Sequence, residues 1–386
     1  MPRKAPNGFG SIRKVIKAGS VYFEGRYTDP ILHKQKSVSA KTEAECRQKL
    51  QAIQAKIFTG QYVVPSKLTL GAYLDDWIKN RVNVEESTRK LYAQSIRLYI
   101  IPILGSIRLQ DLRYTHCQEM VQRLVRDPKK KKQLSAKSVR NAAGILSKAL
   151  ADAVRGELIA NNPAANLDLP RTVKAPPKVM ESAEQTVFLD AIRKTPYERI
   201  FLFGLYTGAR ISEVLGLQWK NIDMKTGEIR IDKQLSRKNR ESASRELKGT
   251  KTHKGRVIIV PRYVLDMLKA QDIQQKEWRL RAGQLWNNPD GLVFTRENGS
   301  PMPHTTIANS FKRIAEKIGR PDLSFHSLRH TFITDEIRSG TDVKTVSEMA
   351  GHSTIAVTMD VYAAATNEMK EAAARRRQEA HEKAKA

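Results

Sequence analysis

The first sixty residues show a hydrophobic pattern that predicts a small sheet followed by one helix. Three short segments have strand character and are separated by Gly and Pro, namely residues 12–15, 21–27 and 37–40. Thr42 then begins Thr-Glu-Ala-Glu, a capping box in which Glu45 is the reciprocal partner. An apolar stripe follows at Leu50, Ile53 and Ile57. We expect a three-stranded sheet backed by one helix.

From residue 67 to about residue 166 the apolar positions follow a helical period. Thr69 is the expected N-cap of a helix whose apolar residues recur at i, i+3, i+4, i+7 and i+8: Leu70, Tyr73, Leu74, Trp77 and Ile78. A second helix is predicted from Ser87 to Pro102, with Leu91, Ile96, Leu98 and Ile101 on its apolar side. A third begins after Ser135 and carries Val139, Leu146, Leu150 and Val154. We expect these side chains to form the core of a helical domain.

Proline and basic residues mark a linker after the helical stretch. The prolines are Pro163, Pro170, Pro176 and Pro177, and the basic residues among them are Arg171, Lys174 and Lys178. Ser182 and Gln185 then predict another capping-box helix, and residues 227–261 are rich in strand signals. We expect an α+β, mainly helical protein with domains at 1–62 and 67–168, a linker at 169–180, and a mixed helical domain with a small β-sheet at 181–386.

The charge of the chain favours a polyanionic partner. Its 386 residues exceed one typical domain, and 68 Lys and Arg against 40 Asp and Glu give a formal net charge of +28. Such an excess is the electrostatic footprint of a nucleic-acid-binding protein, although a solubilising excess or a ribosome-associated basic protein stays open. Five basic residues lie on or near the first predicted strands: Arg13, Lys14, Arg26, Lys34 and Lys36. With these residues the sheet could bind in a DNA groove, but they could equally form an ordinary solvated face.

The cysteines and the apolar runs exclude several classes of protein. Cys46 and Cys117 are the only cysteines and form no Cys-x-x-Cys or Cys/His cluster, so we expect two inert thiols, without a disulfide framework or a zinc site. No apolar run is long enough to span a bilayer, and the first ten residues have no apolar leader segment. We expect a soluble, intracellular protein that is not associated with a membrane.

Three short segments carry the candidate chemistry. The first is Thr-Gly-Ala-Arg210-Ile-Ser-Glu213, in which a turn feeds Arg210 into a helix and Glu213 lies one turn further on, where it can hold the guanidinium. The second contains His326 and Arg329, which are three apart and therefore lie on one helical face. Arg binds two phosphate oxygens with its fork, and His exchanges protons near neutral pH. The third is a Gly-His pair that ends in His352, followed ten residues later by Tyr362.

Taken together, the three segments resemble the phage integrase, or tyrosine recombinase, family. The catalytic domain of that family carries Thr-Gly-x-Arg-x-x-Glu, then His-x-x-Arg, then Gly-His and finally a tyrosine, in this order. The matching residues here are Arg210, His326, Arg329, His352 and Tyr362. The family also has a lysine on a β-hairpin between the first two boxes. Lys251, in Lys251-Thr-His-Lys-Gly-Arg256, fits it, with Lys254 and Lys248 as nearby alternatives.

The resemblance implies a reaction and a set of roles. Tyr362 would attack the scissile phosphate to give a 3′-phosphotyrosyl link, while Arg210 and Arg329 hold the non-bridging oxygens. Lys251 would protonate the departing 5′-oxygen. His326 would accept the proton of the tyrosine, and His352 would form a hydrogen bond with the phosphate. Metal and cofactor are not needed for this chemistry, and none is expected. His330 and Trp219 are assigned to helix packing or local hydrogen bonding.

The resemblance also implies an organisation and partners. Residues 67–168 resemble the family's core-binding domain, and residues 1–62 resemble its arm-type DNA-binding domain. The expected partners are double-stranded DNA attachment sites, other copies of the chain in a tetramer on DNA, and accessory excision or DNA-bending proteins. In the tetramer, the helix-prone tail after Tyr362 would dock on a neighbouring protomer. The activity implied is integration and excision of a mobile element. Two alternatives stay open: relaxation of DNA in the manner of a type IB topoisomerase, and a catalytically silent DNA-binding regulator.

Overall fold

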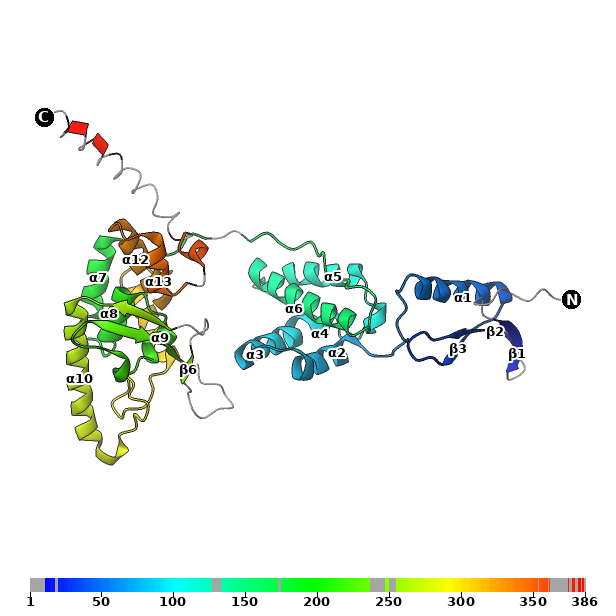
Figure 1. Ribbon diagram of the computed structural model, residues 1–386, viewed down its shortest axis with the longest axis horizontal. Helices are drawn as coiled ribbons and strands as arrows, with labels where there is room; N and C mark the ends of the chain where they lie inside the picture. The colour runs from blue at the N-terminus through cyan, green and yellow to red at the C-terminus, as the bar shows by residue number, and fades with distance from the viewer. Residues whose placement is uncertain are drawn as a thin grey trace. The chain divides into compact units, whose positions relative to one another are not determined.

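The computed structural model describes residues 11–17, 20–126, 133–172, 175–236, 247–249, 255–352, 354–359 and 361, together with a few positions between 374 and 384. The chain divides into two compact units, Met1–Val173 and Lys174–Ala386 (Figure 1). The finer division into domains at 1–62 and 67–168 stays a prediction. Among the described helices, none has the length and apolarity needed to cross a membrane.

The first unit begins with an antiparallel sheet in the order β1-β2-β3, with β1 at Ile12–Lys17, β2 at Ser20–Thr28 and β3 at Gln35–Ala40. Helix α1 (Glu43–Phe58) covers one face, and Thr42 caps it by accepting the amide of Glu45, as the sequence predicts. Gly25 allows a close approach of helix and sheet, because a Cβ atom there would lie 3.3 Å from both Cys46 Sγ and Leu50 Cδ2.

The strand register sorts the basic residues of this sheet onto two faces. Successive side chains of a strand point to opposite sides, and Gly25 faces α1, so its neighbours Glu24 and Arg26 face away from the helix. Arg13 lies opposite Glu24 and forms an ion pair with it at 2.6 Å. Lys14 and Lys36 pair with helix-facing positions instead, and Lys36 binds the buried Asp29 at 2.7 Å.

The helical part of the first unit contains α2 (Leu70–Asp76), the π-helical segment η1 (Trp77–Arg81), α3 (Glu86–Ser95), a second π-helical segment η2 (Ile96–Ile100), α4 (Ile101–Leu104), the 3₁₀ turn η3 (Leu109–Asp111), α5 (Tyr114–Val125) and α6 (Ala136–Arg155). Thr69 and Ser135 cap α2 and α6 as predicted. Trp77 is fully buried, donates from Nε1 to Asp152 at 2.7 Å and stacks on Tyr92.

The predicted second helix of this region is wrong in three details. Ser87 lies inside α3, which begins after Glu85, and Leu91 and Leu98 are 65% and 44% exposed instead of buried. Pro102 lies in the first turn of α4 and does not end the helix. The physical reason is η2: a π-helical turn holds an extra residue, so the apolar face shifts and Ile96 and Ile100 are buried. A proline in a first turn loses no helical hydrogen bond.

Both cysteines lie in the first unit and are free and buried. Burial raises the pKa of the Cys117 thiol to about 12, so this group stays protonated at neutral pH.

The described part of the second unit is mainly helical and contains two small two-stranded sheets. Its helices are α7 (Ser182–Ile192), α8 (Glu198–Thr207), α9 (Ile211–Leu215), α10 (Arg262–Ala282), α11 (His304–Lys317), α12 (Phe325–Arg338) and α13 (Val343–Ala350), with 3₁₀ turns η4 (Trp219–Asn221) and η5 (Gly283–Leu285). Antiparallel strands β4 (Glu228–Ile231) and β7 (Arg256–Ile259) form one sheet, and β5 (Lys233–Leu235) and β6 (Leu247–Gly249) form the other. The capping box of α7 uses Glu181 and Glu184, one residue before the predicted pair.

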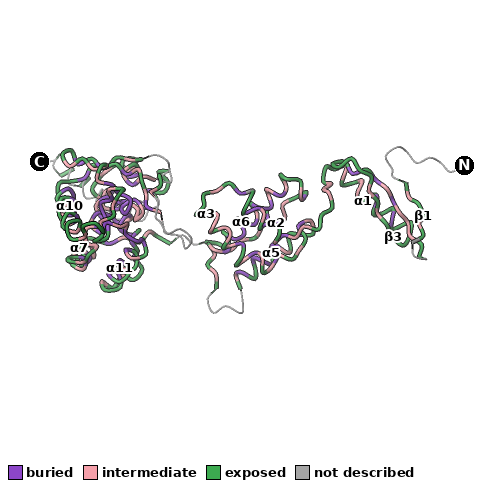
Figure 2. The backbone as a smooth tube through the Cα atoms, turned by 90° about the horizontal axis from the view of Figure 1, so that it is seen from below, coloured by how far each residue is buried: buried purple, intermediate pink, exposed green. Residues whose placement is uncertain are grey.

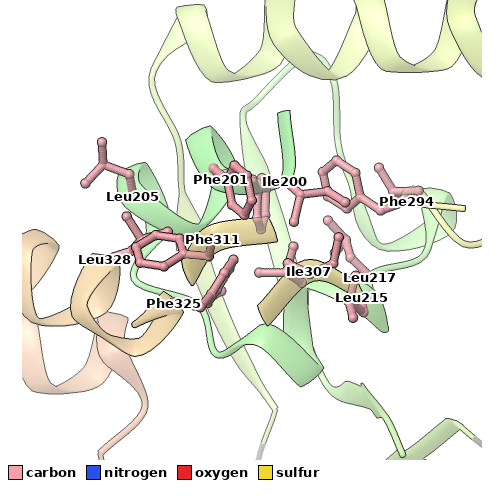
Figure 3. Packing of buried hydrophobic residues seen from close by; sticks show 14 of the residues in the cluster. Ile200, Phe201, Leu205, Leu215, Leu217, Phe294, Ile307, Phe311, Phe325 and Leu328 are labelled. Carbon is pink, nitrogen blue, oxygen red and sulfur yellow. The ribbon is translucent and has the colours of Figure 1, made fainter. Parts of the chain in front are cut away.

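Aromatic side chains from three helices form the centre of this unit. Phe201 of α8, Phe311 of α11 and Phe325 of α12 lie with ring centroids 5.7 to 6.2 Å apart (Figure 3). The buried stretches of this unit gather in its interior (Figure 2). Each fully buried phenylalanine stabilises the fold by about 1.5–3 kcal/mol. Because Phe325 and Leu328 anchor α12 in this core, the polar residues of the same helix are held in fixed positions.

Candidate active site

The first part of the site is the turn that joins α8 to α9. Gly208 ends α8 in the left-handed conformation, with φ of 61°, and Arg210 then adopts an extended backbone as the N-cap of α9. A Cβ atom on residue 208 would lie 2.5 Å from Cδ1 of Phe332, so both the turn and its packing require glycine. The turn therefore delivers Arg210 to a fixed place beside α12.

Arg210 is held by a side chain and by the backbone. Its Nη1 donates to Oε1 of Glu213 at 2.8 Å, and its main-chain N–H donates to Oε2 of the same carboxylate at 2.9 Å. Its Nη2 donates to the carbonyl of Gly351 at 3.2 Å. The predicted pairing of Arg210 with Glu213 is present, and it is part of a capping box at the start of α9.

Glu213 binds a second arginine that sequence reasoning did not assign a role. Arg256, the first residue of β7, donates from Nη2 to Oε2 of Glu213 at 2.8 Å and from Nε to the carbonyl of Met349 at 2.7 Å. Burial alone would raise the pKa of Glu213, but the hydrogen bond from Arg256 and the charges of Arg256 and Arg210 lower it to about 2. The carboxylate is therefore charged throughout the physiological range.

Arg329 of α12 carries a buried guanidinium that does not use all of its hydrogen-bond donors. Its side chain is 1% exposed, and Nη1 donates to the carbonyl of Gly208 at 2.8 Å. Within the described part of the chain, its Nε and Nη2 have no hydrogen-bond partner. Burial, followed by the charge of Arg210, lowers the pKa of Arg329 to about 9. An unpaired buried donor on a charged group is costly, and such groups gather at sites that bind an anion.

His352 lies at the end of α13, on a turn formed by glycine. Gly351 ends the helix in the left-handed conformation, with φ of 68°, and His352 follows with its N–H bonded to the carbonyl of Ser347 at 3.0 Å. Its Nδ1 lies 2.8 Å from the hydroxyl of the buried Thr358. Burial, then the charges of Arg329 and Arg210, lower the pKa of His352 to about 3. The imidazole is therefore neutral at pH 7, with Nε2 as its second hydrogen-bonding group.

His326 stands one turn before Arg329 on α12. Its ring meets the ring of His330 edge-on, with centroids 4.6 Å apart. Desolvation by the surrounding site, followed by the charges of His330, Arg329 and Arg210, lowers the pKa of His326 to about 4. The residue as a whole is still exposed, so a bound molecule can reach this neutral base.

Four of the six predicted site residues are thus described. Arg210 donates to the carbonyl of Gly351, next to His352, and Arg329 donates to the carbonyl of Gly208, two residues before Arg210, while His326 lies one turn before Arg329 on α12. Lys251 and Tyr362 lie outside the described residues, as does Lys254, while the alternative Lys248 is exposed on β6. Val361, next to Tyr362 in sequence, is buried among residues of α12 and α13: Phe332, Ile333, Ile337, Val346 and Ala350.

The assembled groups suit the binding of an oxyanion. Two guanidiniums, those of Arg210 and Arg256, bind the buried carboxylate of Glu213, the buried guanidinium of Arg329 lies beside them, and the imidazole of His352 is neutral. Among the described residues, no three His, Cys, Asp or Glu side chains form a cluster that could hold a metal ion. Sequence reasoning missed Arg256 and the carbonyls that anchor the arginines. The only signal for Arg256 was a charged residue at the start of an otherwise apolar strand, Arg256-Val-Ile-Ile.

Comparison with known proteins gives two family matches along this chain. Residues 178–369 match the model of the phage integrase family, and residues 69–125 match the model of the phage integrase N-terminal SAM-like domain. The chain is 27% identical over 349 residues to a "Tyrosine recombinase XerC-like" protein of Caldanaerobacter subterraneus subsp. tengcongensis, covering 85% of this chain and 87% of the relative. It is 26% identical to an integrase of Streptomyces ambofaciens, covering 84% and 83% of the two chains.

Solved structures share the fold. The Tn1549 transposon integrase in complex with transposon right end DNA superimposes with a TM-score of 0.66 at 24% identity, over 79% of this chain and all of that chain. A lambda integrase tetramer bound to a Holliday junction gives a TM-score of 0.58 at 16% identity, over 94% of this chain and 96% of the other. The two family matches, which lie in the same order as the helical region and the arginine-histidine site, establish the identity: the chain belongs to the phage integrase family and is a tyrosine-type site-specific recombinase.

Proposed function

We propose that this recombinase cuts and rejoins double-stranded DNA at the attachment sites of a mobile element, through a 3′-phosphotyrosyl intermediate on Tyr362, and so integrates and excises that element. The observation that carries the proposal is Arg329, whose buried guanidinium keeps two donors without a partner beside Arg210 and His352.

A phosphodiester explains the chemistry of these residues. Attack on it is slow because its negative charge repels nucleophiles, so catalysis needs fixed positive donors where charge develops. Arg210 and Arg329 supply forked guanidinium donors for the two non-bridging oxygens. Neutral His352 can add a hydrogen bond from Nε2, because Thr358 fixes its Nδ1 side. Such donors, already in place before the reaction, stabilise the transition state without rearrangement.

The remaining steps need a nucleophile, a base and an acid. The phenol of a tyrosine has a pKa near 10, so Tyr362 needs neighbouring cations and a base to lose its proton. His326, exposed and neutral, can take that proton. Lys251 would protonate the 5′-oxygen that leaves as the Tyr362–phosphate bond forms. The phosphotyrosyl bond retains the phosphodiester energy, so a 5′-hydroxyl can later attack it and release Tyr362. Support for Tyr362 comes from buried Val361, which packs with α12, the helix of Arg329.

The proposed partners follow from charge and from the relatives. A net charge of +28 suits a duplex that each unit contacts. Solved integrases of this fold are bound to DNA as dimers and tetramers, and we propose the same tetramer for this chain. Residues 1–62 would bind arm-type sites, with Arg13 and Arg26 on the face of the sheet that α1 leaves uncovered. We also propose that accessory DNA-bending or excision proteins take part in the reaction, and that the protein acts in the bacterial cytosol.

The test begins with the junctions of the element that carries the gene. Their sequence defines a duplex in which a nick near the cleavage site traps the covalent intermediate. Wild-type protein should form a covalent protein–DNA adduct and should recombine two such sites, whereas Tyr362→Phe should bind the duplex and form no adduct. Absence of an adduct with wild-type protein would favour a silent DNA-binding regulator. Relaxation of a plasmid without the site, together with failure to recombine two sites, would favour a topoisomerase.

A further inference from the structure

Arg256 is a largely buried arginine that the proposed mechanism leaves without a role. It begins β7 and lies opposite Ile231 of β4, and its side chain is 12% exposed. Nε donates to the carbonyl of Met349 at 2.7 Å, and Nη2 donates to Glu213 at 2.8 Å. One guanidinium therefore joins the start of α9 to the last turn of α13.

The contact with Glu213 bears on Arg210. Oε1 of Glu213 accepts from Nη1 of Arg210, and Oε2 accepts from Arg256 and from the main-chain N–H of Arg210. The side chain of Arg210 is 40% exposed, so packing alone does not fix it. If Arg256 were lost, Glu213 would keep its burial and lose one of its two charged partners. The carboxylate that orients Arg210 would then be held from one side only.

The contact with Met349 bears on His352. The last carbonyls of a helix have no partner within the helix and need donors from elsewhere. Arg256 donates a hydrogen bond to the carbonyl of Met349, and Arg210 donates one to the carbonyl of Gly351. Arg256 also packs against the turn, because a Cβ atom on Gly351 would lie 2.8 Å from its Nη1. The turn that carries His352 thus rests on Arg256.

We propose that Arg256 is a positioning residue of the recombination reaction, which holds Arg210 through Glu213 and His352 through the end of α13, so that both reach the same phosphate. The inference rests on the proposed function. It assigns Arg256 no contact with DNA. Loss of Arg256 should therefore slow cleavage while the protein still folds and binds its site.

The experiment compares three full-length variants on the nicked junction duplex. Arg256→Gln removes the charge, and Arg256→Lys keeps the charge but cannot serve both partners with a fork. Arg230→Gln is the matched control, since Arg230 is an exposed arginine opposite Val257 in the same sheet. Three quantities are measured: the single-turnover rate of adduct formation, the Kd for the duplex, and the melting temperature.

Arg256→Gln should slow adduct formation about 100-fold and Arg256→Lys about 10-fold, with Kd for both within about threefold of wild type. Arg230→Gln should react within about twofold of wild type. In the double variant Glu213→Gln with Arg256→Gln, the rate should fall by less than the product of the two single effects, because both changes break the link through Glu213 and only the contact with Met349 is lost in addition. A double variant in which the two defects multiply would overturn the role through Glu213.

A substrate with sulfur in place of the bridging 5′-oxygen separates positioning from general-acid catalysis. The thiolate leaves without a proton, so this substrate should restore the rate of a variant that lacks the acid, such as Lys251→Ala. It should leave Arg256→Gln slow, because the defect lies in the groups that hold the phosphate. Full rescue of Arg256→Gln would overturn the inference.

The remaining outcomes also decide the question. Cleavage by Arg256→Gln within about threefold of wild type overturns the inference, as does a loss of rate that only parallels a loss of folded protein or of DNA binding. Failure of wild-type protein to form any adduct overturns the proposed function and this inference with it.

Discussion

Buried polar groups in the helical region of the first unit differ from those in the second unit in whether their hydrogen-bond donors have partners. In the helical region, the hydroxyl of Tyr73 donates to the carbonyl of Ala149 and the indole of Trp77 donates to Asp152, so both buried donors are satisfied. In the second unit, Glu213 and Arg329 are buried charges, and two donors of Arg329 lack a partner among the described residues. The first arrangement is typical of a region built for stability, and the second of a region built to bind and react.

The largest effect that follows from this difference concerns Arg329. Arg329→Met keeps the length of the side chain and removes the charge. Adduct formation should fall at least about 1000-fold, because two donors to the phosphate are lost. The free energy of unfolding should fall by no more than about 1 kcal/mol, since an unpaired buried charge is removed along with one hydrogen bond. Single-turnover cleavage and urea denaturation measure the two effects.

Arg313→Met is the control for that change, because Arg313 is an exposed arginine on α11. It should leave both quantities close to wild type. If Arg329→Met unfolded the protein, Arg329 would be a structural group like Trp77, and the distinction between the two regions would be lost.

The next effect concerns stability in the helical region. Trp77→Ala removes a fully buried indole, its hydrogen bond to Asp152 and its stacking on Tyr92. The free energy of unfolding of that region should fall by about 3–5 kcal/mol. Leu91→Ala, at an exposed position of α3, should cost less than about 0.5 kcal/mol. Hydrogen exchange of α2 and α6 in the full-length chain reports the change, and equal effects of the two substitutions would contradict the assigned core.

A smaller effect is the pH dependence of the second unit. The pKa values of His352 and His326 are lowered to about 3 and about 4 from an ordinary 6.5. Below about pH 6.5 these two histidines therefore bind protons in the unfolded chain but stay neutral in the folded protein. The melting temperature should therefore fall as the pH drops from 7 towards 5. Glu213, with a pKa of about 2, adds a further loss only below about pH 4.5.

Tryptophan fluorescence follows this transition well, because Trp219, Trp278 and Trp286 all lie in the second unit. In His352→Asn the loss between pH 7 and 5 should become smaller. An unchanged pH profile in that variant would show that His352 is not the group responsible.

The smallest effect is expected at an exposed ion pair of the first unit. Arg47 and Glu43 lie one turn apart on α1, 2.9 Å apart, with both side chains more than half exposed. Arg47→Gln should change the free energy of unfolding by less than about 0.5 kcal/mol, because water screens such pairs. Thermal denaturation at low and high salt checks this, and a loss above 1 kcal/mol would mean that surface pairs contribute to this unit after all.

The extent of sequence-based prediction differs between local and long-range features. The three strands, the caps Thr42, Thr69 and Ser135, and the pairing of Arg210 with Glu213 depend on neighbours in sequence, and the structure confirms them. The π-helical segments were missed because an extra residue in a turn leaves no local signature. Arg256 was missed because its partners, Glu213 and Met349, are brought to it only by the tertiary fold.

The roles of Lys251 and Tyr362 remain predictions, since both residues lie outside the described part of the chain. So does the division of the first unit into two domains. The resemblance to the family identified four residues that do lie in one site. Their burial was not predictable from the motifs, because a His-x-x-Arg pattern does not reveal that Arg329 is buried while His326 is exposed.

Each of the three arginines of the site is anchored to a main-chain carbonyl: Arg329 to Gly208, Arg210 to Gly351, and Arg256 to Met349. A carbonyl is present whatever side chain the residue carries. The site can therefore tolerate extensive sequence drift in the segments around it, provided that the two left-handed turns keep their shape. The residues least free to vary are then not only the charged ones but also Gly208 and Gly351, at which any side chain would collide with Phe332 or Arg256.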